Sequence, residues 1–123
     1  MKRILVIDDE EQILNLLKAM FENEGYMVDT STNGHNGLVC INNNLPDLII
    51  CDIVMPVKEG IETIIEIKKK YPSIKIIAIS GGGKNNLQDY LLMAKSIGAS
   101  KTLSKPFRRK EILDAVEELI GLD

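Results

Sequence analysis

The chain has 123 residues and a formal net charge of -3, and 45% of its residues are hydrophobic. A single domain of this length buries a core without disulfides or structural metals, so we expect one domain spanning residues 1–123. The acidic balance argues against direct binding of nucleic acid or of an acidic membrane surface. The first apolar run is too short for a signal peptide, and no stretch approaches the ~20 apolar residues of a membrane span. We therefore expect a cytoplasmic protein.

Apolar runs alternate with amphipathic segments along the whole chain. The runs are predicted to be strands and cover residues 4–7, 27–31, 48–51, 74–79 and 102–104. The segments are predicted to be helices and cover residues 10–25, 35–43, 60–71, 87–97 and 109–120. Their apolar residues recur at helical spacing, and glycines stand at several of their ends. Strict alternation of strands and helices predicts an α/β fold with a parallel sheet and right-handed crossovers.

Polar residues follow four of the predicted strands. Asp8 and Asp9 come after the first strand, Asp52 after the third, Ser80 after the fourth and Lys105 after the fifth. Each alone is explained equally well as a turn former, a helix cap or a solvated side chain. Together they lie at equivalent strand ends, which meet at one edge of a parallel sheet, where open α/β sheets bind their ligands.

This set of side chains suits phosphoryl transfer. Crowded carboxylates repel one another, and a hard divalent cation with oxygen ligands, above all Mg²⁺, relieves the repulsion. Asp52 stands alone at a central strand end, while Asp8 and Asp9 are paired. We therefore expect Asp52 to be the nucleophile, with Mg²⁺, the Ser80 hydroxyl and the Lys105 ammonium stabilising the phosphoryl oxygens.

Several motifs resemble the receiver domain of two-component response regulators. They are "VIDDE" at residues 6–10, "DIVMP" at residues 52–56 with Gly60 after it, "IS" at residues 79–80 and "KPF" at residues 105–107. "TNGHNGL" at residues 32–38 is also similar to the second loop and helix of that family. The resemblance covers nearly the whole chain, and no effector domain is expected within it.

The resemblance implies a flavodoxin-like (βα)5 fold, a doubly wound sheet with strand order 2-1-3-4-5. It implies that a phosphohistidine on a sensor histidine kinase or a histidine phosphotransfer protein phosphorylates Asp52, which switches binding of a downstream protein target. It further implies that Mg²⁺ is held by Asp9, Asp52 and the backbone carbonyl of Val54, with Asp8 acting mainly through water. Ser80 and Lys105 would contact the phosphoryl oxygens, and the peptide bond before Pro106 would be cis. Such a chain is a signalling switch that catalyses only its own phosphorylation and slow dephosphorylation.

The chain departs from the family at one position. Receivers commonly carry Tyr or Phe three residues before the active-site lysine, and this chain has Thr102 there. A threonine has no ring whose burial reports the state of Ser80. We therefore expect the coupling between phosphorylation and the surface of the fourth helix, fifth strand and fifth helix to be weaker or to be carried differently. We favour the glycine-rich stretch at residues 81–83 as the segment that transmits the change instead, because its backbone can shift at low steric cost.

Two other functions compete with this interpretation. A phosphatase of the haloacid dehalogenase type also uses an aspartate nucleophile and Mg²⁺, but takes the nucleophile from the first strand in a DxD pattern and needs a cap for its substrate. A receiver-like interaction module that is never phosphorylated is the other alternative. "SGGGK" at residues 80–84 invites a phosphate-binding P-loop interpretation, but Ala78 and Asn85 replace the required first glycine and the Ser/Thr.

Overall fold

The computed structural model describes residues 1–53, 57–80 and 87–122 of the chain. Its strands form one parallel sheet in the order β2-β1-β3-β4-β5, as expected. The strands are β1 (Arg3–Ile7), β2 (Met27–Ser31), β3 (Leu48–Asp52), β4 (Lys75–Ser80) and β5 (Lys101–Ser104). The predicted α/β fold is therefore confirmed.

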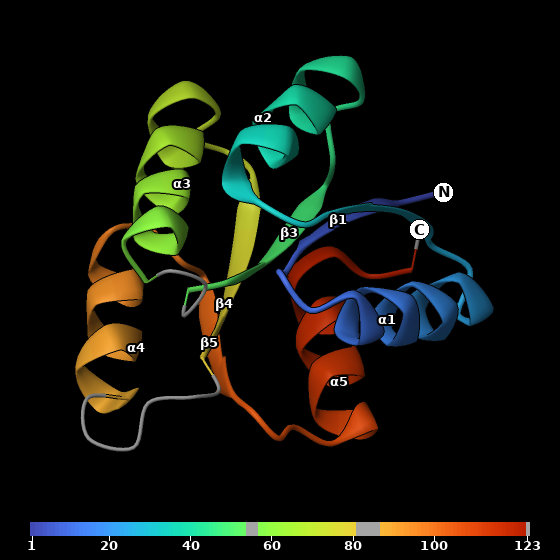
Figure 1. The fold of residues 1–123 in the computed structure, drawn as a ribbon. Helices are drawn as coiled ribbons and strands as arrows, with labels where there is room; N and C mark the ends of the chain where they lie inside the picture. The colour runs from blue at the N-terminus through green and yellow to red at the C-terminus, as the bar shows by residue number, and fades with distance from the viewer. Residues whose placement is uncertain (54–56, 81–86, 123) are drawn as a thin grey trace.

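Helices cover both faces of the sheet. The helices are α1 (Glu11–Asn23), α2 (Gly34–Asn43), α3 (Val57–Lys70), α4 (Leu87–Ser96) and α5 (Arg109–Ile120). Figure 1 shows α1 and α5 on one face and α2, α3 and α4 on the other. Within the described part of the chain, no helix combines the length and the apolar character needed to cross a membrane.

Two hydrophobic cores lie on opposite faces of the sheet. Alternate residues of β1 enter different cores, because successive side chains of a strand point to opposite faces. Ile4 and Val6 pack with α1 and α5, whereas Leu5 and Ile7 pack with α2, α3 and α4. Both faces of the central strands β1, β3 and β4 are buried, which explains why these strands are nearly continuous apolar runs.

Two element boundaries differ from the prediction in ways that matter for the site. Helix α3 begins at Val57, three residues earlier than predicted, because its first turn contains Lys58, Glu59 and Gly60 and so lacks the apolar period. Asp52 and Ser80 are the last residues of β3 and β4, rather than the residues that follow them. The backbones of both residues are therefore held in the register of the sheet.

The start of α3 lies directly against the end of β3. A Cβ added at Gly60 would stand 2.6 Å from the Cα of Ile53 and 2.8 Å from the carbonyl oxygen of Asp52. Both atoms belong to the backbone and cannot rotate away. Glycine at residue 60 thus permits a close approach between the helix and the strand that carries Asp52.

Candidate functional site

The carboxyl edge of the sheet brings the predicted residues together. Asp8 and Asp9 follow β1, Asp52 ends β3, Ser80 ends β4 and Lys105 follows β5. The backbone of each segment is tied to the neighbouring strand. The amide of Asp8 donates to the carbonyl of Ser31 at 3.1 Å, and the amide of Lys105 donates to the carbonyl of Ser80 at 2.9 Å.

The Lys105 ammonium is the centre of the site. Its Nζ donates to Asp8 Oδ2 and Asp52 Oδ2 at 2.9 Å each, and to Glu10 Oε1 at 3.3 Å. Asp8 and Asp52 are buried, and the Lys105 side chain keeps only 15% of its exposure. Because buried charges require partners, the ammonium stabilises two carboxylates that would otherwise be costly to bury.

This arrangement shifts the pKa values of two groups. Burial by itself lowers the pKa of Lys105, but the hydrogen bonds and charges of Asp52 and Asp8 outweigh burial and raise it above the ordinary lysine value. Burial raises the pKa of Asp8, and the charge of Asp52 raises it further. Hydrogen bonds from the Glu10 amide and from Lys105 only partly oppose that rise. Lys105 is therefore a cation at neutral pH.

The carboxylates form a cluster that suits a divalent metal. One oxygen from each of Asp8, Asp9, Glu10 and Asp52 lies within 4.8 Å of the others. All four are hard, negatively charged oxygen donors, which Mg²⁺ prefers, and Asp9 and Glu10 are exposed to solvent. The donor set of this acidic cluster therefore fits the magnesium ion that the sequence predicts.

Ser80 completes the edge with a buried hydroxyl. Its side chain is fully buried, and its Oγ has no hydrogen-bond partner within the described residues. Buried polar groups are nearly always paired, so an unpaired hydroxyl beside a cationic and acidic site is a position where an acceptor atom of a ligand is expected.

The structure adds one residue that sequence reasoning missed and leaves two expectations without a test. Glu10 contacts Lys105 although the two are far apart in sequence, and only the "VIDDE" motif hinted at its place. Val54, expected to offer a backbone carbonyl to the metal, and the glycines at residues 81–83 lie outside the described residues. The peptide bond between Lys105 and Pro106 is cis, as expected.

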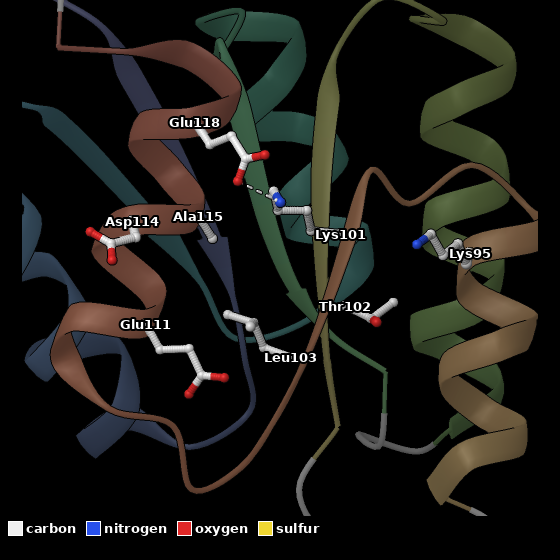
Figure 2. A pocket seen from close by; sticks show the side chains of 8 residues that line it. All are labelled: Lys95, Lys101, Thr102, Leu103, Glu111, Asp114, Ala115 and Glu118. Carbon is white, nitrogen blue, oxygen red and sulfur yellow. Dashed lines mark ion pairs between the residues drawn. The ribbon is translucent and has the colours of Figure 1, made fainter.

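Thr102 lies beside a surface hollow of about 400 Å³ between α4, β5 and α5. Figure 2 shows its side chain pointing toward α4, whereas Leu103 points toward α5. On the α5 side, Lys101 makes an ion pair with Glu118 at 2.7 Å. Thr102 is half-buried and has no aromatic ring, and the hollow lies beside it.

Comparisons with known proteins agree with this geometry. Residues 4–117 match the family model of the response regulator receiver domain. The chemotaxis protein CheY of Halobacterium salinarum is 32% identical over 119 residues, which are 97% of this chain and 97% of that protein. Sporulation initiation phosphotransferase F of Bacillus subtilis is 32% identical over 121 residues, which are 98% of this chain and 95% of that protein.

A solved structure supports the same assignment. A response regulator receiver domain protein from Clostridium thermocellum superimposes with a TM-score of 0.88 at 32% identity, covering 98% of this chain and 95% of that one. These matches favour a receiver over the phosphatase of the haloacid dehalogenase type. The chain therefore belongs to the family of response regulator receiver domains, which act as phosphoacceptor switches in two-component signalling.

Proposed function

We propose that Asp52 accepts a phosphoryl group in a Mg²⁺-dependent reaction, and that this modification changes how the domain binds a protein target. The observation that carries the proposal is the environment of the Asp52 carboxylate. It is buried, it lies 2.9 Å from the Lys105 ammonium, and it ends a strand beside the strand that carries the unpaired Ser80 hydroxyl.

The reaction is a displacement at phosphorus. An Asp52 carboxylate oxygen attacks the phosphorus, the bond from phosphorus to the donor nitrogen of a phosphohistidine breaks, and an acyl phosphate forms. Negative charge develops on the equatorial phosphoryl oxygens during transfer. Lys105 and Ser80 donate to those oxygens, and the buried setting strengthens both contacts because little water competes.

A magnesium ion held by the acidic cluster supplies further positive charge for the phosphoryl oxygens. Both oxygens of Asp8 already accept hydrogen bonds, from the Glu10 amide at 2.9 Å and from Lys105. Asp9 is exposed, which supports the proposal that Asp9 is a direct ligand and that Asp8 acts through water. The proposed donor is a phosphohistidine on a histidine kinase or phosphotransfer protein.

Intact mass spectrometry after incubation with acetyl phosphate tests the proposal. The wild-type chain should gain the mass of one phosphoryl group with Mg²⁺ present and should gain none when the metal is chelated. Asp52→Asn should abolish the gain, because an amide is not a nucleophile for this reaction.

Asp114→Asn is the matched control, since it removes an exposed carboxylate of α5 that pairs only with Lys110 in the described structure. It should be phosphorylated like the wild type. Phosphorylation of Asp52→Asn would show that another residue is the acceptor. No phosphorylation of the wild-type chain would favour a receiver-like module that works without the modification.

A further inference from the structure

Glu10 stands in an unusual relation to helix α1. It is the N-cap residue of α1, but its side chain makes no capping hydrogen bond. Ser, Thr, Asp and Asn are preferred at this position because their short side chains reach the free amides of the first turn. The Glu10 carboxylate instead lies 3.3 Å from Lys105 Nζ. The side chain is therefore used by the site and not by the helix.

The ammonium of Lys105 is fully engaged. It has three hydrogens, and oxygens of Asp8, Asp52 and Glu10 accept from it. The side chains of Asp8 and Asp52 keep 3% and 6% of their exposure, whereas Glu10 keeps 62%. The contact with Glu10 is also the longest of the three, so it is the partner that Lys105 releases most easily.

We propose that Glu10 is a positioning residue that competes with the phosphoryl group for Lys105 and at the same time strengthens the metal site. The inference rests on the proposed function of Asp52. When a phosphoryl group is attached to Asp52, its oxygens need a hydrogen from the ammonium. Any time that Lys105 spends with Glu10 weakens this contact, and the negative charge of Glu10 also opposes an anionic group.

The metal responds in the opposite direction. The Glu10 carboxylate belongs to the cluster whose oxygens lie within 4.8 Å of one another. The negative charge of Glu10 lowers the free energy of a bound cation, whether or not the Glu10 carboxylate is a direct ligand. One side chain thus favours Mg²⁺ and disfavours the phosphoryl group.

Isothermal titration calorimetry on Glu10→Gln separates this role from a structural one. Mg²⁺ is titrated alone, and beryllofluoride, an anionic stand-in for the phosphoryl group, is titrated at saturating Mg²⁺. We expect Mg²⁺ to bind about twofold to fivefold more weakly and beryllofluoride about twofold to fivefold more tightly than in the wild type, the range typical of exposed charge pairs.

Two further variants sharpen the test. Glu11→Gln removes the same charge one residue along, from an exposed side chain in the first turn of α1, and should change neither affinity. Glu10→Asp keeps the charge but is one methylene shorter, so it breaks the Lys105 contact. This variant should bind Mg²⁺ with the affinity of the wild type and should still bind beryllofluoride more tightly than the wild type.

The outcomes are distinguishable. If Glu10→Gln bound both Mg²⁺ and beryllofluoride more weakly, the role of Glu10 would be merely structural and the inference would be overturned. No change in either affinity would also overturn it. A wild-type domain that binds no beryllofluoride in the presence of Mg²⁺ would contradict the proposed function itself. An equal effect of Glu11→Gln would show that net charge, and not the contact with Lys105, is responsible.

Discussion

The buried hydroxyl of Ser80 is a feature that stability alone does not explain. Leaving a buried polar group unpaired costs about 1–3 kcal/mol. Ser80 Oγ has no partner within the described residues, and the residue is fully buried. The cost is understandable if the hydroxyl is kept for a ligand atom that arrives only when the domain is phosphorylated.

Ser80→Ala should therefore separate stability from function. We expect the metal-free variant to be more stable by about 1 kcal/mol, because the unpaired hydroxyl is removed. Its affinity for beryllofluoride should fall by about tenfold, because a hydrogen bond to an anion is lost. Urea denaturation measures the first effect and calorimetry measures the second.

Ser104→Ala provides the control for Ser80→Ala. Ser104 of β5 lies opposite Ser80 of β4 in the register of the sheet, but Ser104 is exposed. This control should alter neither quantity. If Ser80→Ala lowered stability and left beryllofluoride binding intact, the hydroxyl would have a structural partner rather than a ligand.

The sequence predicts which residues stand at the site but not all of the contacts between them. Asp8, Asp9, Asp52, Ser80 and Lys105 were found because each stands at the end of a strand, and parallel strands share one edge. The contact between Glu10 and Lys105 was missed, because it joins residues 95 positions apart through the reach of two long side chains. Whether Ser80 is paired also depends on its burial and its surroundings, which no local pattern encodes.

Among the elements, helix α3 packs closely against the strand that ends at Asp52. Gly60→Ala places a methyl group within 2.6 Å of the Ile53 Cα and 2.8 Å of the Asp52 carbonyl oxygen. Alanine favours a helix over glycine by about 1 kcal/mol, but overpacking against a backbone costs about 1–3 kcal/mol. The helix must shift as a whole, so we expect a net loss of stability and weaker phosphorylation of Asp52.

Urea denaturation and the acetyl phosphate assay measure these two effects of Gly60→Ala. Glu62→Ala is the control, since Glu62 is exposed on the same helix and its loss should change stability by less than about 0.5 kcal/mol. A stable and fully reactive Gly60→Ala domain would mean that α3 moves away from β3 at little cost.

The order of the elements was predictable because two periodicities dominate the sequence. Buried strands appear as unbroken apolar runs, and amphipathic helices repeat every three to four residues. The apolar period predicts a start of α3 that is too late, because the first turn from Val57 to Gly60 has no apolar side chain apart from Val57. Gly60 is required by the close contact of α3 with the end of β3, and a contact between two elements cannot be read from the local sequence.

Across the whole molecule, Tyr26 ties the turn after α1 to the end of α5. Its hydroxyl donates to the carbonyl of Gly121 at 3.0 Å, and its ring meets Phe21 edge-on. At the other end of α5, Arg109 makes an ion pair with Glu24 at 3.3 Å. These contacts hold α5 against the end of α1 and the turn that follows it.

Tyr26→Phe should lower stability by about 1 kcal/mol at neutral pH, because it removes the hydrogen bond but keeps the ring. Burial raises the pKa of Tyr26 above 10.0, and the charges of Glu117 and Glu24 raise it further. The folded state thus holds the proton more tightly than the unfolded state. The advantage of the wild type is complete below pH 10.0 and is lost as the pH rises through the folded pKa.

Urea denaturation of both proteins at about pH 8 and about pH 11 measures this difference. The gap between wild type and Tyr26→Phe should narrow at the higher pH. A gap that widened would mean that the ionised phenolate, and not the neutral hydroxyl, is favoured in the folded state.

The hydrogen bond from the Lys105 amide to the Ser80 carbonyl separates two tasks of one residue. In the proposed function the side chain of Ser80 donates its hydroxyl to a phosphoryl oxygen, while its main-chain carbonyl accepts the hydrogen bond that fixes where Lys105 leaves the sheet. Every amino acid has the same carbonyl, so a substitution at residue 80 changes the first task and leaves the second intact. The side chain at residue 80 can thus be changed without displacing Lys105, so the two groups that we propose to bind the phosphoryl oxygens can be altered independently.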